Sequence, residues 1–502
     1  MSDNLTEEQK LAYEKIINGE NVCIIGKGGS GKSHIISLIM DEETLLLAPT
    51  GMAALNLGGG ARTIHSTLMI GEKSLNAWSW AKVSSFIESK EGQLRNFFSK
   101  YKRIVFDEGS MIISGLFDTF AKIFHTIYGT DSSVLFNGYQ IIMMFDPLQL
   151  PPVKNSLEPY LDLNRGNQNR KLLKSDYIIN NPDFKRLFNK DLDNIVHFTV
   201  NMRNTDPEWN EVLDACRTGF YNINRSEKQR LLTILNSRVF HRNQVTHEGS
   251  PLKELYDNNT VTSLTRKLIE TINKTRLDKL IENNGGLQYC IDRNMGITKQ
   301  VFSDKYIDRV DNPKKLYEVS VNYMDDLGGY YSKKIYNENT RKYEIITECI
   351  ITKRQIVMLR CNQLHPNLKN GSLGKIVDIL CDDYNNVLSI DVKFNSVDDI
   401  ITVKRKDFKH PDISDIQISA FPIIPASAIT IHKLQGQTWT DPLFIHYNKD
   451  VIPYYEKKEH LLYTAISRNK NKDDIFIISD NDLDETYFPV NPIMFEWYLN
   501  HI

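Results

Sequence analysis

Residues 22–40 read Val-Cys-Ile-Ile-Gly-Lys-Gly-Gly-Ser-Gly-Lys-Ser-His-Ile-Ile-Ser-Leu-Ile-Met. An apolar run precedes the glycine-rich stretch 26–33, and a helical stretch follows it, so the order predicts a strand, a phosphate-binding loop and a helix. Glycines let successive backbone N–H groups face phosphate oxygens, while Lys32 reaches the β- and γ-phosphates and the Ser33 hydroxyl binds Mg²⁺. The stretch therefore predicts binding of a nucleoside triphosphate, and an ordinary glycine-rich turn is the less favoured alternative.

The composition is that of a globular chain. Of its 502 residues, 41% are hydrophobic and 25% are charged, which allows three or four domains of about 150 residues each. The formal net charge is −2, so a nucleic-acid partner would need a local basic groove instead of a basic surface overall. The six cysteines have no zinc-type or C-x-x-C spacing, which indicates reduced core residues. Since no signal, transit or transmembrane segment is recognisable, we expect an intracellular soluble protein of the cytoplasm or nucleus.

Apolar runs and amphipathic segments alternate along the first 150 residues. The runs cover 22–25, 45–48, 103–106 and 140–145, which predicts a parallel α/β sheet. Ligands bind beyond the carboxyl ends of parallel strands, so the polar loops that follow these runs should meet at one site. A similar alternation later in the chain predicts a second α/β lobe.

The same patterns predict the domain boundaries. Between the two lobes lies a charged, tyrosine-rich stretch of alternating strands, which predicts an inserted β-rich module. The predicted parts are a first lobe over 1–70 and 101–194, a small insert at 71–100, a second lobe over 195–275 and 416–502, and the β-rich module over 276–415.

An acidic pair, Asp107-Glu108, follows the apolar run 104–106. At the end of a strand beside a phosphate-binding loop, Asp107 would hold the water shell of Mg²⁺ and Glu108 would activate the attacking water. A surface acidic pair at a strand end is the alternative, and the preceding loop makes it less favoured.

The stretch 146–153, Asp-Pro-Leu-Gln-Leu-Pro-Pro-Val, follows the last of the four runs. Paired prolines make a rigid exit from a strand, so Gln149 would be held near the phosphates, where its amide can sense the γ-phosphate. The alternative is a proline-rich turn with an incidental glutamine.

Two arginines assigned to the second lobe, Arg203 and Arg468, are candidate arginine fingers. A guanidinium that reaches the γ-phosphate from a facing lobe stabilises the charge of the transition state and links hydrolysis to lobe closure. An isolated arginine is more often part of a surface salt bridge.

Several polar loops carry donors suited to a phosphodiester backbone. Thr430, His432 and Lys433 offer hydroxyl, imidazole and ammonium groups, and Gln435 with Gly436 would line the nucleotide side. The first lobe repeats this chemistry at Pro49, Thr50, Thr63 and His65. Taken singly, each of these loops is equally consistent with a solvated surface loop.

In their order along the chain, these motifs resemble those of the superfamily 1B DNA helicases, the group of Pif-one, RecD and Dda. Residues 5–9, with Gln9, resemble the adenine-recognising motif. The further motifs, I, Ia, Ib, II, III, IV, V and VI, match residues 26–33, 48–54, 63–66, 107–111, 146–153, 201–203, 421–438 and 462–468. Three features depart from the family pattern: Phe145 replaces a usual glycine, Leu434 replaces a common serine, and residues 279–350 match nothing in the family.

The resemblance implies two RecA-like parallel-sheet lobes with ATP and Mg²⁺ between them, a small β-barrel within the β-rich module, and 5′ to 3′ movement on single-stranded DNA that opens forked duplex. It implies ATP contacts from Gln9, Gly26, Lys27, Gly28, Gly29, Ser30, Gly31, Lys32, Ser33, Gln435 and Gly436. Replication or repair proteins are candidate partners for residues 279–350. An RNA-directed helicase of superfamily 1 and a translocase ATPase that does not unwind remain alternatives, and a non-catalytic scaffold is disfavoured.

A helicase of this kind separates the strands with a wedge. Aromatic side chains suit the task because a base stacked on one contributes about 1 to 3 kcal/mol. The insert at 71–100 supplies four candidates, Trp78, Trp80, Phe97 and Phe98. The alternative is that they form the insert's own small core.

Overall fold

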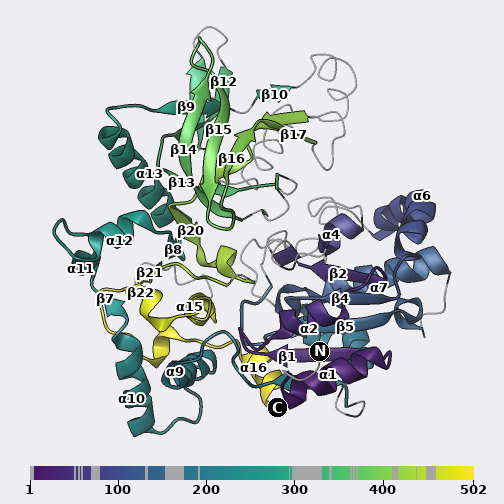
Figure 1. The fold of residues 1–502 in the computed structure, drawn as a ribbon. Helices are drawn as coiled ribbons and strands as arrows, with labels where there is room; N and C mark the ends of the chain where they lie inside the picture. Colours follow the sequence, from purple (N-terminus) through teal and green to yellow (C-terminus); the bar gives the residue numbers. More distant parts are fainter. Residues whose placement is uncertain are drawn as a thin grey trace. The chain divides into compact units, whose positions relative to one another are not determined.

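The structure is a computed structural model that describes residues 5–49, 53–54, 57, 60–68, 80–129, 134–152, 174–189, 191, 193–292, 294–296, 331–337, 342–361, 364–365, 368, 371–409, 417–436, 438–447 and 459–502. The chain forms two compact units, Met1–Tyr256 with Thr430–Ile502, and Asp257–Ile429 (Figure 1). Two predicted site residues, Thr50 and Trp78, lie outside the described residues.

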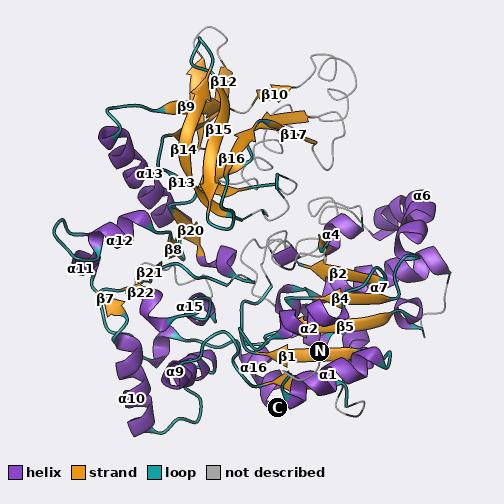
Figure 2. Cartoon of the chain, in the orientation of Figure 1, coloured by secondary structure: helices purple, strands orange, loops and turns teal. Residues whose placement is uncertain are grey.

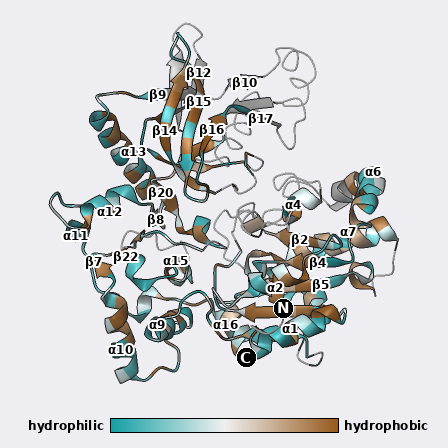
Figure 3. Ribbon diagram, in the orientation of Figure 1, coloured by the Kyte–Doolittle hydropathy of each residue, from teal (hydrophilic) through white to brown (hydrophobic). Residues whose placement is uncertain are grey.

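The first unit contains a six-stranded sheet in the order β3-β2-β4-β5-β1-β6 (Figures 1 and 2). Every neighbouring pair in it is parallel. The sheet confirms the four predicted strand runs, and its inner strands are hydrophobic along their length, as a sheet covered on both faces requires (Figure 3). Its strands are β1 (Val22–Gly26), β2 (Thr44–Ala48), β3 (Arg62–Thr63), β4 (Arg103–Phe106), β5 (Gln140–Phe145) and β6 (Ile195–Phe198).

Strand β6 corrects the predicted lobe boundary. We expected residues from 195 onward to open the second lobe, but β6 pairs in parallel with β1, Cys23 beside Ile195 and Gly26 beside Phe198. It is therefore the edge strand of the first sheet. An apolar run predicts that a strand forms, but not which of two sheets it joins.

Helices cover both faces of this sheet. Helices α1 (Glu7–Ile17) and α2 (Lys32–Ile39) pack on one face. The opposite face is covered by α6 (Trp80–Phe98), α7 (Ser114–Tyr128), α8 (Pro182–Leu187) and α16 (Pro492–Leu499). Two of these differ from the prediction, because α6 was placed in a separate insert and α16 in the second lobe. Both pack into the core of the first sheet instead.

The packing of α6 also corrects one wedge candidate. Phe98 is fully buried, with its ring 4.6 Å from that of Phe124, so it belongs to the core and is not available to stack on a base. Phe97 is half-buried, and the Arg62 guanidinium lies 5.0 Å from its ring centre. For Trp80 the structure describes the helical backbone but not the side chain. Trp80 and Phe97 therefore remain predictions.

The rest of the first unit contains a second parallel sheet, in which β21, β22 and β7 are neighbours. Its elements are α9 (Pro207–Arg217), α10 (Arg225–Asn236), β7 (Val239–Phe240), α11 (Arg242–Thr246), α12 (Lys253–Asn258), η8 (Ile431–Leu434), β21 (Leu443–His446), α15 (Leu461–Ile466) and β22 (Ile475–Ile478). The rings of Phe444 and Phe476 stack across this sheet at 4.7 Å. A second parallel sheet is thus present, as predicted.

The second unit is rich in antiparallel strands, in agreement with the prediction for 276–415. A five-stranded sheet has the order β16-β15-β14-β13-β19, and two three-stranded sheets have the orders β11-β12-β9 and β10-β18-β17. The elements are β8 (Val261–Ser263), α13 (Arg266–Asn283), β9 (Tyr289–Asp292), β10 (Asn294–Gly296), β11 (Tyr331–Asn337), β12 (Lys342–Ile351), β13 (Ile356–Leu359), β14 (Leu373–Cys381), β15 (Val387–Phe394), β16 (Ile400–Lys404), β17 (Lys406–Lys409), β18 (Gln417–Ala420), β19 (Ile423–Pro425) and β20 (Ala428–Thr430).

Two further expectations concern the cysteines and the absence of membrane-spanning segments. Cys23, Cys216 and Cys361 are buried free thiols, as predicted, whereas the free thiol of Cys381 is only partly buried, so the prediction of a core position is wrong for Cys381. Among the residues that the structure describes, no helix has both the length and the apolar character that crossing a bilayer requires.

Candidate nucleotide site

The glycine-rich loop joins β1 to α2, and two of its glycines lie where a side chain would be strained and too close to its neighbours. Gly29 and Gly31 both have φ +85°, a conformation that side-chain-bearing residues rarely adopt. A Cβ atom on Gly29 would lie 2.6 Å from Asn201 Oδ1, and one on Gly31 would lie 2.4 Å from Gln9 Nε2. The loop is therefore held close to two neighbouring segments, and the backbone N–H groups at the start of α2 form an anion site.

Lys32 begins helix α2, and its Nζ donates to the carbonyl oxygens of Gly26 (2.6 Å) and Lys27 (3.0 Å). Burial lowers the pKa of the Lys32 ammonium, whereas the nearby charges of Asp146, Glu108 and Asp107 act to raise it. The lysine thus faces acidic side chains at the bottom of the loop, as a phosphate-binding lysine beside a metal site does.

The loop opens onto a cavity of about 270 Å³. Most of the predicted nucleotide residues line it: Gly28, Gly29, Ser30, Gly31, Lys32, Ser33, Asp107, Glu108, Gln149, Arg203, Gly436 and Arg468. Six lining residues were not predicted as site residues, namely Ala53, Leu57, Asp146, Met202, Thr438 and Lys470. The cavity thus brings together segments that lie far apart in the sequence.

The acidic pair stands at the carboxyl end of β4. Asp107 is buried, and burial together with the neighbouring Glu108 charge raises its pKa to about 7. Glu108 has φ +51°, uncommon for a residue other than glycine, and its Oε2 accepts a hydrogen bond from Gln435 Nε2 (3.0 Å). Two adjacent carboxylates beside the Ser33 hydroxyl are oxygen donors of the kind that Mg²⁺ prefers, so the residues fit a metal-bound triphosphate.

Two arginines and one glutamine meet above Gly28. A Cβ atom built on Gly28 would lie 3.1 Å from Arg468 Nη2, 3.2 Å from Gln149 Nε2 and 3.3 Å from Arg203 Nη1. Burial, and then the Arg468 charge, lowers the pKa of Arg203 to about 9. Guanidinium groups this close repel each other, and an anion between them, such as a phosphate, relieves the repulsion.

Both arginines are held by the same short segment. Arg203 Nη1 donates to the Ser467 carbonyl (2.7 Å), and Arg468 Nε donates to the Thr464 carbonyl (2.9 Å). The side-chain Oε1 atoms of Gln149 and Gln435 are buried acceptors that have no hydrogen-bond partner within the described part of the chain. A bound water or a protonated group could satisfy them.

Four predicted ATP contacts stand outside the cavity lining. Gln9 Nε2 donates to the Ser30 carbonyl (3.1 Å), and Gly26 offers its carbonyl to Lys32. Gln435 acts on Glu108, as described above. The Lys27 ammonium bonds the Asp214 carboxylate at 2.6 Å, so its side chain is directed toward α9, and a contact of Lys27 with nucleotide through its backbone N–H stays a prediction. Gln9 and Gly26 thus contact other residues of the loop, whereas Gln435 contacts the acidic pair.

Three predicted DNA contacts of the first lobe, Pro49, Thr63 and His65, lie at one edge of the sheet. Ala48, just before Pro49, pairs with Thr63 across β2 and β3. The Thr63 hydroxyl accepts from Ser66 N–H (3.1 Å) and so caps α4 (Ile64–Thr67). Burial lowers the pKa of His65 to about 4, so at neutral pH it offers an uncharged imidazole.

The remaining predicted DNA contacts lie at the end of β20 and in η8. Thr430 and Lys433 are half-buried there, and His432 is exposed. Gln435 and Gly436 come directly after them, so this short segment reaches from the candidate DNA contacts to the nucleotide cavity.

A family model matches the N-terminal part of the sequence. Residues 4–193 match the family model of the PIF1-like helicases, and they include the phosphate-binding loop, the acidic pair and Gln149. Over residues 4–193 the chain is therefore similar in sequence to the PIF1-like helicases.

Individual relatives extend this comparison. The ATP-dependent DNA helicase PIF1 of Xenopus laevis is 32% identical over 154 residues, which are 30% of this chain and 23% of that protein. The ATP-dependent DNA helicase Pif1 of Bdellovibrio bacteriovorus is 24% identical over 486 residues, or 95% of this chain and 88% of that protein. The chain thus matches about a quarter of the length of its vertebrate PIF1 relatives.

A solved structure shares the fold along the chain. Pif1 helicase from Bacteroides, in complex with ADP-AlF3 and single-stranded DNA, superposes with a TM-score of 0.62 at 22% identity and covers 99% of this chain and 97% of its own. The predicted α/β class, with RecA-like parallel sheets and a β-rich module, is confirmed.

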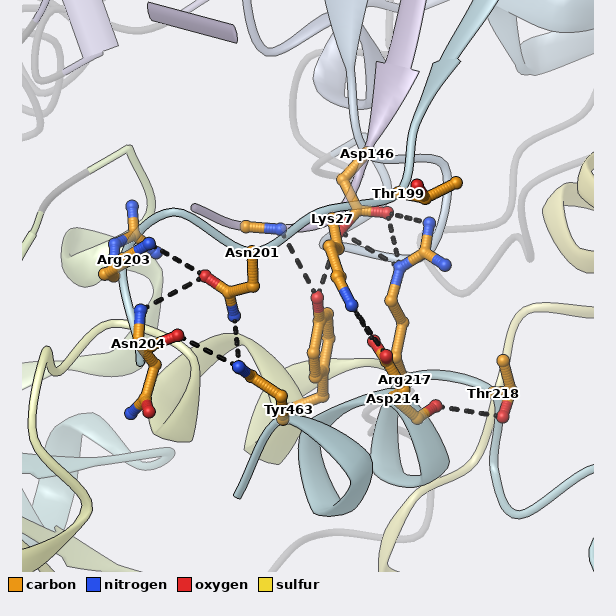
Figure 4. A network of polar contacts seen from close by, with 12 residues as sticks. Lys27, Asp146, Thr199, Asn201, Arg203, Asn204, Asp214, Arg217, Thr218 and Tyr463 are labelled. Atoms are coloured by element: carbon orange, nitrogen blue, oxygen red, sulfur yellow. Dashed lines mark hydrogen bonds and ion pairs between the residues drawn. The ribbon is translucent and has the colours of Figure 1, made fainter. Parts of the chain in front are cut away.

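Sequence reasoning missed a buried polar network next to this nucleotide site (Figure 4). Asp146 is 1% exposed and accepts hydrogen bonds from Arg217 Nη2 (2.8 Å), Gln149 Nε2 (3.1 Å) and Tyr463 Oη (3.2 Å). Asp146 could have been found, since it directly follows β5 and stands three residues before Gln149. Arg217 has no such signal, because it is the last residue of an ordinary amphipathic helix.

Proposed function

We propose that the protein is an ATP-dependent DNA helicase that moves 5′ to 3′ along single-stranded DNA and unwinds duplex. The observation that carries this proposal is the convergence of Arg203, Gln149 and Arg468 on Gly28 of the phosphate-binding loop, beside Asp107 and Glu108. That set provides every group needed to bind a triphosphate, polarise it and respond to its hydrolysis.

Each residue of the site has a distinct task. The loop N–H groups and Lys32 bind the phosphates, and Ser33 with Asp107 would hold Mg²⁺, which when bound neutralises charge between the β- and γ-phosphates. Glu108 accepts the proton of the attacking water. The Gln435 amide donates to Glu108 Oε2 and so holds this carboxylate in place.

The arginines link hydrolysis to movement. Arg203 follows the edge strand of the first sheet, whereas Arg468 follows α15 beside the second. Both arginines contact the segment 464–467, so loss of the γ-phosphate changes the contacts between the two parallel sheets. A change of this kind moves the segment containing Thr430 relative to the one containing Thr63.

The relatives support DNA as the nucleic acid along which the protein moves. The relatives named above are DNA helicases, and the Bacteroides structure contains single-stranded DNA. We place the strand along Pro49, Thr50, Thr63 and His65 on the first lobe and along Thr430, His432 and Lys433 after β20. The 5′ to 3′ direction rests on the motif resemblance.

Two further parts of the proposal concern the wedge and the segment 279–350. The wedge candidates that remain are Trp78, Trp80 and Phe97. Residues 279–350 are proposed to bind replication or repair proteins, because no motif of the family accounts for them.

A comparison of matched oligonucleotides tests the substrate class. ATP hydrolysis with Mg²⁺ is measured with no nucleic acid, with single-stranded DNA and with RNA of the same sequence. We expect DNA to stimulate hydrolysis more than RNA does. Stronger stimulation by RNA would favour an RNA-directed helicase, because a protein that reads the 2′-hydroxyl prefers RNA. Hydrolysis without stimulation by either would contradict a translocating enzyme.

Two lysine variants control this assay. Lys32→Ala should remove hydrolysis, which rules out a contaminating ATPase. Lys10→Ala removes an exposed lysine whose partner is Glu7 on the same helix, and its rate should equal that of the wild type.

A further inference from the structure

Helix α9 is attached to the nucleotide site by two ion pairs of opposite polarity (Figure 4). Asp214 and Arg217 are three residues apart, so they lie on the same face of the helix. Asp214 binds the Lys27 ammonium of the phosphate-binding loop (2.6 Å), and Arg217 binds the Asp146 carboxylate at the end of β5 (2.8 Å). One helix therefore contacts both the loop that binds phosphate and the segment that carries Gln149.

The two pairs differ in burial. The Asp214 side chain is 49% exposed, whereas the side chains of Arg217 and Asp146 are 4% and 1% exposed. Water screens the first pair and is excluded from the second. The position of Arg217 in the buried pair therefore determines how the Asp146 carboxylate lies at the site.

Arg217 is enclosed on two sides. Its Nε and Nη2 both donate to Asp146 Oδ1, at 3.1 Å and 2.8 Å, and its guanidinium lies 4.5 Å from the ring centre of Tyr498 on α16. Burial alone would raise the pKa of Asp146, but the Arg217 charge and hydrogen bonds hold it at about 2. Asp146 is therefore a fixed carboxylate at neutral pH.

This carboxylate sets the direction of neighbouring groups. Its Oδ2 accepts from Gln149 Nε2 (3.1 Å), so the amide nitrogen faces Asp146 and the buried Oε1 is left as a free acceptor among the described residues. The same Oδ2 accepts from Tyr463 Oη (3.2 Å), and Tyr463 Oη in turn accepts from Gly28 N–H (3.5 Å). One carboxylate thus orients both the glutamine and the tyrosine that contact the loop.

We propose that Arg217 is a positioning residue for ATP hydrolysis: it fixes Asp146 so that Gln149 and Tyr463 are aligned at the phosphate end of the cavity. Arg217 does not itself line the cavity formed by the described residues. The inference rests on the proposed function in that the site hydrolyses ATP, and it adds a residue that no motif of the chain contains.

The test replaces Arg217 with lysine, which keeps the charge but not the paired donors. The matched control is Arg230→Lys on the next helix, where an exposed arginine forms ion pairs with Glu227 and Glu211. For each variant, kcat and KM for ATP are measured with saturating single-stranded DNA. We also measure the affinity ratio between the non-hydrolysable analogue adenylyl imidodiphosphate and ADP, which reports contact with the γ-phosphate without turnover.

A small displacement of Gln149 should lower kcat by about 10- to 100-fold in Arg217→Lys while KM changes less than about threefold. The affinity ratio should move toward one. Arg230→Lys should match the wild type in all three quantities. Equal kcat in Arg217→Lys and the wild type, or a raised KM with unchanged kcat, would overturn the proposal.

A second variant covers the case in which Arg217→Lys does not fold. Tyr463→Phe removes the hydroxyl that contacts Asp146 and Gly28. It should lower kcat and move the affinity ratio toward one, as Arg217→Lys does. An unchanged ratio in Tyr463→Phe would contradict the positioning role. If the wild type itself hydrolyses no ATP, the proposed function fails, whereas the affinity ratio still decides whether Arg217 positions Gln149.

Discussion

Substituting Gly31 by alanine should damage the nucleotide site by two separable effects. Gly31 has φ +85°, and an alanine in this conformation loses about 1 to 2 kcal/mol. Its Cβ atom would also lie 2.4 Å from Gln9 Nε2, which must move and give up its hydrogen bond to the Ser30 carbonyl. Losing that buried bond adds about 1 kcal/mol, for a total of about 2 to 3 kcal/mol.

The chain supplies a matched control. Gly19 has φ +84°, and a Cβ atom there meets nothing within 4 Å, so Gly19→Ala should lose only the backbone contribution of about 1 to 2 kcal/mol. Urea unfolding of both variants measures these free energies. Binding of a non-hydrolysable ATP analogue should weaken about tenfold in Gly31→Ala and stay unchanged in Gly19→Ala, because only Gly31 belongs to the phosphate-binding loop.

A double variant separates the steric effect from the backbone effect. Gln9→Ala removes the side chain that the new Cβ atom would meet, so Gly31→Ala should cost about 1 kcal/mol less in the Gln9→Ala background than in the wild type. Equal losses of stability in Gly31→Ala and Gly19→Ala, or no coupling between Gln9 and Gly31, would refute the reasoning.

Three other predictions follow from charge and burial. Lys32→Ala and Glu108→Gln should each lower ATP turnover by at least about 100-fold, and normal turnover in Glu108→Gln would contradict its role in activating water. Burial lowers the pKa of His460 to about 3, below its ordinary 6.5, so unfolding takes up a proton between these values and stability falls as the pH falls through that window. His460→Asn suits the φ of +60° and should reduce the slope of unfolding free energy between pH 4.5 and 5.5 by about 1.4 kcal/mol per pH unit; an unchanged slope excludes this histidine as its source. Asp214→Asn should cost less than about 1 kcal/mol in urea unfolding, because its carboxylate is half-exposed, and a larger loss would show that its pair with Lys27 is stronger than its exposure implies.

The sequence predicted those features that local chemistry determines. Apolar runs located β1, β2, β4 and β5, and the spacing of glycines with Lys32 and Ser33 located the phosphate-binding loop. The polar ends of β4 and β5 met at one cavity, since parallel strands bring their carboxyl ends to the same edge.

Features that depend on distant partners were missed. The apolar run of β6 is compatible with either sheet, and only its pairing with β1 decides. Helix α16 follows the second sheet in sequence but packs on the first, where Trp497 stacks on Phe145 at 5.8 Å. Phe98 was judged by its place in a polar stretch, whereas its burial depends on α7. The role of Arg217 could not be predicted from the sequence, because its partner, Asp146, lies 71 residues away along the chain.

Strand displacement tests the central claim most directly. Two partial duplexes, one with a 5′ single-stranded tail and one with a 3′ tail, are incubated with ATP and Mg²⁺, with Lys32→Ala as the inactive control. The account predicts unwinding from the 5′ tail alone. Unwinding from the 3′ tail would contradict the proposed polarity, and stimulated hydrolysis without unwinding of either duplex would show a translocase that does not act as a helicase by itself.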